Sequence, residues 1–257
     1  MHRTIVRLSL AILVIVFVFP AASFAQEEAV FLQYGEVYAG VLNDTRFEQT
    51  FTFEGEAGQV VVVDTRPNGV NSTIVSTDLI LDGPNGRVGV KTPVDFLPGS
   101  NNLLAVQLPD DGTYSLFIAR DGGRSGSDEG EFALELTLAE PLTETAIEGE
   151  LSIETIDNYY FVTGLPRFQV QFDQTDTLAA YSANVVVSRL NGDGSFSNVA
   201  VIEGREAFRG GSVIVNGGET EVYLVAVTTD TPNDYLTQTI DVEYTLGLGD
   251  LDALPGS

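Results

Sequence analysis

The chain has 257 residues, of which 12 are basic and 37 acidic, so its formal net charge is −25. A charge of this sign repels phosphates and anionic lipid headgroups, which excludes nucleic acid and membrane surfaces as partners. The sequence contains no cysteine, which excludes disulfides, but its 44% hydrophobic content is sufficient for a packed core.

The N-terminus has the three zones of a secretory signal peptide. Basic residues lie within residues 1–7, a nearly pure apolar run follows at 8–19, and small side chains stand at Ser23 and Ala25. A membrane-spanning helix needs about 20 apolar residues, and this run is shorter. We therefore expect residues 1–25 to be removed between Ala25 and Gln26. The product is expected to be secreted, periplasmic or at the cell surface of a bacterium, with no membrane insertion.

Removal of this segment changes the chemistry that the chain can perform. The mature charge becomes −27, because two basic residues and no acid are lost. The only histidine, His2, is lost as well. Ser-His-Asp and Cys-His catalysis and histidine-bound zinc are then excluded. Lys91, the one lysine, has no nucleophile motif beside it, and paired carboxylates are inevitable among so many acids. We expect no catalytic residue and no enzyme activity.

After residue 25 the pattern is that of short strands. Apolar and polar residues alternate over 51–53, 132–138 and 240–246, which indicates strands with one buried face. Val60 to Val63 form an uninterrupted run, as expected of a strand covered on both faces. Turn sequences rich in Gly, Asn and Asp separate such segments, for example 82–86. This pattern predicts an all-β protein, either a sandwich or a barrel.

Several landmarks recur at an offset of about 109 residues, which indicates an internal repeat. The matching segments are 40–42 with 149–151, 61–64 with 170–173, and Tyr114 with Tyr223. Near Phe51 the register is ambiguous, because Phe51 and Phe53 match Tyr159 and Phe161 better at 108. We predict two tandem domains after the signal peptide (1–25), at 26–140 and 141–250, with a short tail at 251–257. Pro141 is expected to end the last strand of the first domain.

The first copy resembles the bacterial pre-peptidase C-terminal domain family over about residues 34–138. The matching features are Gly40-x-Leu42, Phe51-x-Phe53, the 58–62 strand, the 78–86 strand and turn, the 108–116 turn and strand, and Phe132-x-Leu134-x-Leu136. The second copy is a more divergent match, since its 184–192 segment lacks the Asp-Gly-Pro turn. The resemblance implies jelly-roll-like β-sandwiches, found as accessory modules on secreted peptidases, some of which bind calcium or assist substrate binding.

One loop is a candidate calcium site. Calcium takes six to eight oxygen ligands, and the 121–131 loop offers Asp121, Asp128, Glu129 and Glu131. The loop lacks the regularly spaced acids of a strong calcium loop and contains the cation Arg124. The alternative is a solvated hairpin loop without metal. Calcium is the only cofactor that the sequence suggests.

Tyrosines are the candidates for sugar binding, because the chain has no tryptophan. Adjacent residues of a strand face opposite ways, so Tyr159 and Tyr160 cannot both enter one core. One of them is expected to point outward or toward the other domain. Others lie near turns, namely Tyr34, Tyr38, Tyr181 and Tyr235. The alternative is that these rings fill the cores or cover the domain join.

Two further pairs of residues have structural interpretations. Tyr114 and Tyr223 occupy equivalent positions beside turns and are predicted to be core or corner tyrosines. Asp64 and Asp173 are predicted to cap turns at the ends of equivalent strands.

These observations predict a secreted, non-enzymatic binding or interaction module whose partner is an extracellular protein or a glycan. It could act as an accessory to a secreted hydrolase. A carbohydrate-binding or calcium-binding extracellular protein is the alternative.

Overall fold

The computed structural model describes residues 29–68, 72–73, 77–91, 102–143, 145–152, 155, 157–175, 182–204, 210–229 and 241–250. β-Strands make up nearly all the regular structure of these residues, which confirms the all-β prediction. None of the described segments forms a helix with the length and apolar character needed to cross a bilayer. The predicted cleavage site at Ala25 and Gln26 lies outside the described residues.

The first half of the chain forms two facing sheets with the strand orders β1-β3-β8-β5-β6 and β2-β9-β4-β7. Its strands are β1 (Val30–Phe31), β2 (Val37–Leu42), β3 (Glu48–Gly55), β4 (Val60–Pro67), β5 (Thr77–Gly83), β6 (Gly86–Lys91), β7 (Asn102–Gln107), β8 (Gly112–Arg120) and β9 (Gly130–Leu138). A single 3-10 turn, η1 (Gly123–Ser125), lies between β8 and β9.

The second half repeats this arrangement with the orders β10-β12-β17-β14-β15 and β11-β18-β13-β16. Its strands are β10 (Glu140–Pro141), β11 (Ile147–Ser152), β12 (Asp157–Thr163), β13 (Arg167–Gln174), β14 (Ala183–Leu190), β15 (Phe196–Ile202), β16 (Gly211–Asn216), β17 (Val222–Thr229) and β18 (Asp241–Asp250). Pro141 therefore lies in a two-residue edge strand of the second half, where its missing N–H costs nothing, and does not end a strand of the first.

Both halves are jelly rolls, as the nesting of their antiparallel pairs shows. In the first half β2 pairs with β9, β3 with β8, β4 with β7, and β5 with β6. In the second half the same nesting joins β11 with β18, β12 with β17, β13 with β16, and β14 with β15. A long hairpin folded over in this way produces two packed sheets.

Each sandwich has its own core, formed by alternate residues of its strands. Phe51 and Phe53 enter the first core, and Tyr160 and Val162 enter the second. This register corresponds to an offset of 109, so the better aromatic match at 108 was misleading. It was misleading because Tyr159 and its neighbour Phe161 point the other way, toward the first sandwich.

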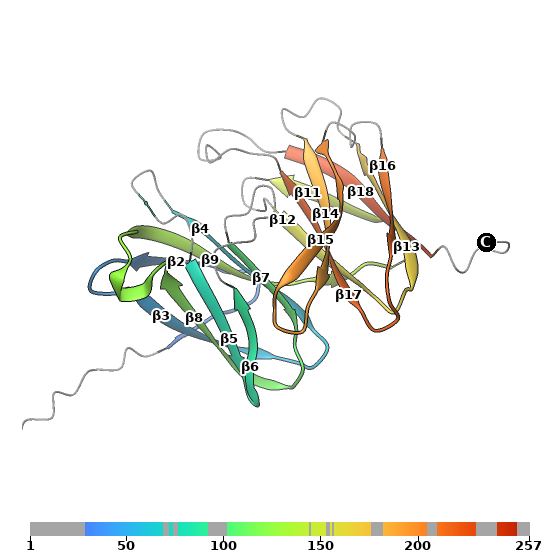
Figure 1. Cartoon of the computed structure of the whole chain (residues 1–257). Helices are drawn as coiled ribbons and strands as arrows, with labels where there is room; N and C mark the ends of the chain where they lie inside the picture. Colours follow the sequence, from blue (N-terminus) through green and yellow to red (C-terminus); the bar gives the residue numbers. More distant parts are fainter. Residues whose placement is uncertain are drawn as a thin grey trace, which may run out of the picture.

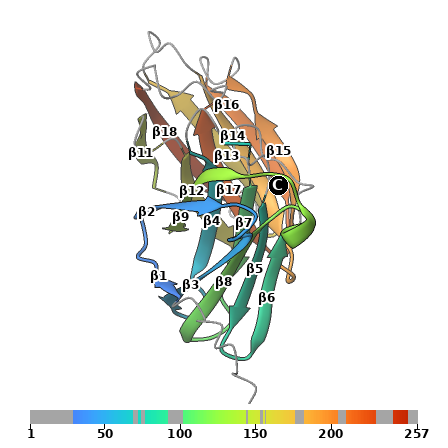
Figure 2. The ribbon, with the colours of Figure 1, turned by 90° about the vertical axis from the view of Figure 1, so that its left-hand side faces the viewer.

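The two sandwiches pack against each other, so the chain has four sheet layers (Figures 1 and 2). The outward face of the four-stranded sheet of the first sandwich meets the outward face of the five-stranded sheet of the second. Strand β4 is consequently covered on both faces, as the run from Val60 to Val63 predicts. Tight main-chain contact adds to this packing, since the Val90 N–H donates to the Asp193 carbonyl at 3.0 Å.

The corner tyrosines are confirmed, whereas the predicted capping aspartates are not. Tyr114 is buried, and its hydroxyl donates to the Asp110 carbonyl at 2.7 Å. The buried Tyr223 donates to the Glu221 carboxylate. Asp64 and Asp173 do not cap turns: both lie within strands, because β4 and β13 continue beyond them.

Candidate functional site at the join of the sandwiches

An apolar cluster forms the centre of the join between the sandwiches. Strands β4 and β7 of the first sandwich meet β12, β14, β15 and β17 of the second. The buried members are Val60, Val62, Leu103, Ala105, Ala139, Tyr159, Val186, Phe196, Val222, Leu224 and Ala226. Burial of this much apolar surface stabilises the packed arrangement of the two sandwiches.

A polar cluster lies beside the apolar centre. Arg66 lies between two acids of the first sandwich, with Nη2 at 3.2 Å from Glu135 Oε2 and Nη1 at 3.8 Å from Asp64 Oδ2. The second sandwich adds the half-buried Asp157 and the buried Tyr159 beside this group. Three carboxyl groups thus share one guanidinium in a place largely closed to water.

This environment shifts the ionisation of the groups within it. Burial, and then repulsion from Asp64, raises the pKa of Asp157 well above its ordinary value. Burial, and then the carboxyl groups of Asp157 and Asp64, raise the pKa of Tyr159 well above its ordinary value. Asp157 Oδ2 and the Tyr159 hydroxyl oxygen are both closed to water. Compared with an exposed aspartate, this environment shifts Asp157 toward its protonated form.

A groove of about 600 Å³ opens at the join, where strands β7 and β14 lie beside each other. Its apolar lining comes from both sandwiches and comprises Val88, Val106, Leu108, Pro109, Leu190 and Val222. Polar groups from Gln107, Asn191, Thr220 and Glu221 complete the lining. No aromatic side chain is present among the described residues that line it.

Two guanidinium groups lie in this groove, one from each sandwich. Arg87 of β6 pairs with Asp82, with Nε at 2.9 Å from Oδ1. Arg189 of β14 pairs with Glu221, with Nη1 at 3.3 Å from Oε1. Both arginines remain substantially exposed. Their unused N–H donors can therefore bind a carboxylate or carbonyl of a ligand.

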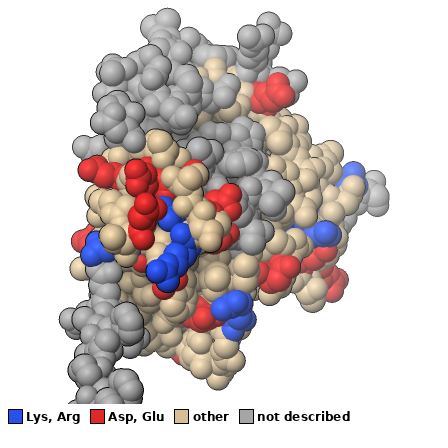
Figure 3. Space-filling model, turned by 60° about the vertical axis from the view of Figure 1, so that its left-hand side comes forward, with Lys and Arg blue, Asp and Glu red and all other residues tan. Residues whose placement is uncertain are grey.

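Sequence reasoning did not find this groove, because its residues belong to two segments about a hundred positions apart. No motif joins 87–109 with 189–222, and the groove exists only once the sandwiches are packed. The sequence offered one signal for this groove. Arg87 and Arg189 are cations in a chain that has only 12 Lys and Arg, so each of them is a candidate for a specific role. On the face shown in Figure 3, acidic and basic side chains lie next to each other.

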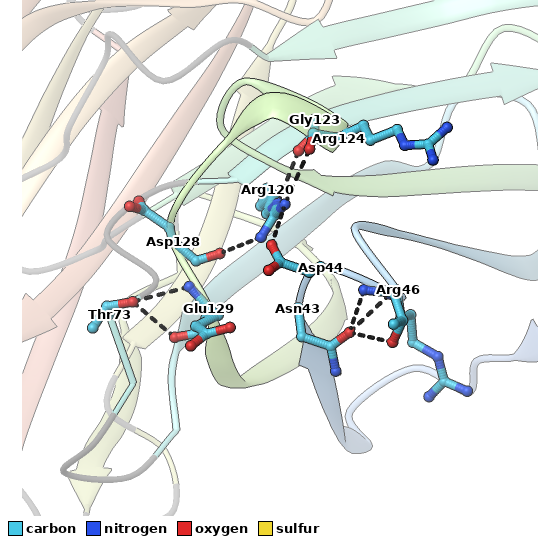
Figure 4. Close-up of polar contacts among 10 residues, drawn as sticks. Asn43, Asp44, Arg46, Thr73, Arg120, Gly123, Arg124, Asp128 and Glu129 are labelled. Atoms are coloured by element: carbon cyan, nitrogen blue, oxygen red, sulfur yellow. Dashed lines mark hydrogen bonds and ion pairs between the residues drawn. The ribbon is translucent and has the colours of Figure 1, made fainter.

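The predicted calcium loop has an arginine in its interior (Figure 4). Arg120, only 1% exposed, donates to the carbonyls of Gly123, Arg124 and Asp128 at 2.8, 3.2 and 3.4 Å. Its Nη2 also lies 3.0 Å from Asp44 Oδ1. Carbonyl oxygens that a calcium ion would need are thus bound by Arg120, and Arg124 contributes only its carbonyl.

The four candidate calcium ligands are not gathered around one point. Burial raises the pKa of the Asp78 carboxyl, and the nearby Asp121 raises it further. The Glu129 carbonyl accepts from the Thr73 N–H at 2.9 Å, and the Glu131 carbonyl accepts from the Ser72 hydroxyl at 2.8 Å. The described residues contain no group of three or more acidic side chains able to hold a metal ion.

The tyrosines considered for sugar binding are largely structural where they are described. Tyr159 covers the join, and the Tyr160 hydroxyl lies 2.8 Å from that of Tyr244 in the second core. Tyr34 and Tyr38 pack edge-on against Phe53 and Phe51. Tyr181 and Tyr235 lie outside the described residues. The tyrosines that the structure describes thus favour the structural interpretation.

Comparisons with known proteins give distant likenesses only. No family model matches the chain, and no curated protein matches its sequence. Among solved structures, the periplasmic inhibitor of g-type lysozyme, PliG, from Salmonella Typhimurium is similar at 21% identity and a TM-score of 0.30. That match covers 43% of this chain and 97% of PliG.

Two further structures span more of the chain. A putative secreted protein from Eubacterium rectale matches at 9% identity and a TM-score of 0.27, covering 82% of this chain and 72% of that one. The CBM22-1-CBM22-2 tandem domain of Paenibacillus barcinonensis Xyn10C matches at 11% identity and a TM-score of 0.22. It covers 83% of this chain and 91% of its own.

Proposed function

We propose that the mature chain is an exported, non-enzymatic binding module whose groove holds an extended segment of an extracellular protein. The observation that carries this proposal is the groove itself, which both sandwiches line. An apolar floor binds apolar side chains, while Arg87 and Arg189 receive a carboxylate. Arginine suits this role because its planar group binds carboxylates with two parallel hydrogen bonds. The amide nitrogens of Gln107 and Asn191 already donate to Gly58 and Ser195, so their side-chain oxygens are the groups that accept main-chain N–H donors of the ligand.

The resemblance to the pre-peptidase C-terminal family supports a more specific role. As an accessory module of a secreted hydrolase encoded elsewhere, the chain would bind that enzyme or its protein substrate. The mature protein is then found outside the cytoplasm, in the periplasm, at the surface or in the medium.

A pull-down from the envelope and medium of the producing bacterium tests the groove. The mature chain is compared with Arg189→Ala and Arg87→Ala, and with Arg167→Ala as a matched control. Arg167 is an exposed arginine at the start of β13, in the sheet that takes no part in the join. We expect one captured protein to be lost with both groove variants and retained with the control. Equal capture by all four proteins would show that the groove is not the site.

A glycan is the second candidate, favoured by the free face of the sheet β11-β18-β13-β16. There Gln169 and Gln171 lie beside Gly249 and Gly247, and a recess of about 320 Å³ is lined by Gln171, Asp173, Ser212 and Thr245. Amide, hydroxyl and carboxylate groups of this kind hydrogen-bond sugar hydroxyls. A glycan array separates the candidates: binding abolished by Gln171→Ala supports this face, and a blank array leaves the protein ligand.

Calcium binding remains a prediction of the sequence. The test is isothermal titration of the purified mature chain with calcium, together with its melting temperature. If millimolar calcium gives no heat of binding and no change in melting temperature, the chain does not bind calcium.

A further inference from the structure

The outer face of the five-stranded sheet of the first sandwich lies on the side away from the second (Figures 1 and 2). It is equivalent to the face that the second sandwich buries in the join. The centre of that buried face is a row of paired residues from β12, β17 and β14, namely Tyr159, Ala226 and Val186. In the first sandwich the same pairing joins Thr50, Phe117 and Ile80, which remain at least partly exposed.

Aromatic and acidic side chains distinguish this face from the other surfaces of the described residues. Phe31 (57% exposed) and Phe117 (39%) are the exposed phenylalanines of that part of the chain. Both lie on this face, since the partner of Phe31 in β3 points outward. In the row next to Phe117, Glu48 and Asp78 lie on either side of Ala119. The face therefore offers an apolar centre with acids at one end, which suits a partner that carries a cation.

The join shows what covers a face of this kind. Val60 and Val62 of β4 pack with the central row of the second sandwich, and Arg66 of the same strand lies beside Asp157. Asp157 is the equivalent of Glu48, because each lies one row beyond the central row of its own sheet. The covering strand thus supplies aliphatic side chains to the row and a guanidinium to the acid beyond it.

We propose that the outer face of β3, β8 and β5 is a second docking surface, whose partner is an aliphatic, arginine-bearing sheet face of another exported β-sandwich protein. Aliphatic side chains of that sheet cover Phe117 and Ile80, and its arginine pairs with Glu48. This surface is separate from the groove, since neither Phe117 nor Ile80 lines the groove.

A second copy of this chain does not have the chemistry of that partner. Its free four-stranded face carries Gln169, Gln171 and Thr175 at the positions equivalent to the two valines and the arginine of β4. Burying these amides against Phe117 would remove their hydrogen bonds to water without supplying new ones. The net charge of −25 on each copy also opposes their approach. The partner is therefore a different protein.

The same difference between the copies supplies a probe of defined chemistry. Gln169→Val, Gln171→Val and Thr175→Arg give the free four-stranded face of the chain the side chains that β4 presents in the join. Phe117→Asp is added so that the probe cannot bind copies of itself through the proposed surface. The mature chain with these four substitutions is labelled and titrated with the unlabelled parent, by fluorescence anisotropy and analytical ultracentrifugation.

We expect the probe to form a one-to-one complex with the parent. Phe117→Asp or Ile80→Asp in the parent is expected to weaken binding about tenfold or more. Glu48→Gln should weaken it less and reduce its dependence on salt. Val37→Asp is the matched control, because it places the same charge at an exposed aliphatic position on β2, and it should leave binding unchanged. Equal melting temperatures of these variants and the parent show that the fold is retained.

Other outcomes overturn the proposal. A probe that does not bind the parent would show that this face does not accept an aliphatic sheet. Binding that survives both Phe117→Asp and Ile80→Asp would place the probe elsewhere on the chain. A sugar that binds the parent on a glycan array and is lost with Phe117→Asp would make a glycan the occupant. Arg87→Ala and Arg189→Ala should leave the probe bound, so failure of this surface is distinguishable from failure of the groove.

Discussion

The two sandwiches have the same topology, but each uses a different sheet to contact the other. Positions 60 and 62 of β4 are valines buried in the join, whereas the equivalent positions of β13, 109 residues later, are Gln169 and Gln171 on a free face. On the other sheet the relation is reversed. Thr50 of β3 lies on a free face, and its equivalent, Tyr159 of β12, is buried in the join.

This difference shows why the copies diverged. A contact between unlike faces of two similar domains leaves one face of each kind free, and identical copies could add to such a stack indefinitely. Apolar residues at both faces of both copies would therefore favour fibres. Polar residues on the free faces oppose further stacking, which accounts for the difference between the copies at these equivalent positions.

The largest expected effect comes from giving the first sandwich the residue of the second at this position. Val62→Gln places an amide without hydrogen-bond partners in the apolar join and removes a buried aliphatic side chain. We expect the free energy of unfolding in urea to fall by about 3 kcal/mol. A fall below about 1 kcal/mol would mean that position 62 is not buried against the second sandwich.

The next effect concerns the ends of equivalent strands β8 and β17. Arg120 stands where the second sandwich has Thr229, and its guanidinium holds three carbonyls of the loop after β8. Arg120→Thr leaves these carbonyls without their charged donor, and we expect a loss of about 2 to 3 kcal/mol by the same denaturation. Arg124→Thr is the control, because only its carbonyl takes part. Similar losses from both variants would contradict this account of the loop.

A smaller effect is expected from the ionisation of Asp157, which lies in the join, whereas its equivalent, Glu48, lies on a free face. A raised pKa in the folded state means that the stabilising contribution is complete below the ordinary pKa and is lost as the pH rises through the raised value. The contribution of Asp157 to the free energy of unfolding is therefore expected to be larger near pH 4 than at pH 7. Asp157→Asn should remove this loss and raise the free energy of unfolding at pH 7 by about 1 kcal/mol.

Thermal or urea unfolding of the parent and of Asp157→Asn across this pH range shows whether Asp157 lowers the stability as the pH rises. Glu48→Gln is the control. Asp64, Arg66, Glu135 and Tyr159 are the other charged or titratable groups around Asp157. An equal change in stability between pH 4 and pH 7 in the parent and in Asp157→Asn would show that this cluster does not favour the protonated acid.

The smallest expected effect on stability is the reverse exchange, Gln171→Val. Gln171 is exposed, so the free energy of unfolding should change by less than about 0.5 kcal/mol. The free face becomes more like the apolar join, and we expect concentration-dependent association by analytical ultracentrifugation. A variant as monodisperse as its parent would weaken the explanation for the divergence of the copies.

Much of the fold was predictable because its signals are local. Alternation identified the strands, and the uninterrupted valines at 60–63 indicated cover on both faces, although not what provides it. The offset near Phe51 stayed ambiguous between 108 and 109, because the aromatic residues Tyr159 and Phe161 at the join resemble aromatic residues of a core. The capping roles of Asp64 and Asp173 failed for a related reason: the strands continue past them, and burial of Asp64 depends on the second sandwich.

The candidate site was less predictable than the fold. The groove depends on long-range packing of segments that share no motif. The sequence analysis assessed the calcium loop from its acids and from Arg124, whereas the side chain that occupies the loop belongs to Arg120, the last residue of the preceding strand. The spacing of residues along the sequence does not show that the side chain of Arg120 turns from the end of its strand into the loop that follows.

The two sandwiches form one packed body through unlike faces. Small-angle X-ray scattering of the mature chain measures whether this packing holds in solution. We expect a radius of gyration near the ~17 Å of a compact chain of this length, with a single-peaked distance distribution that broadens in Val62→Gln. A clearly larger radius with two resolved peaks in the parent would mean that the sandwiches are separate, and that neither the join nor the groove exists in solution.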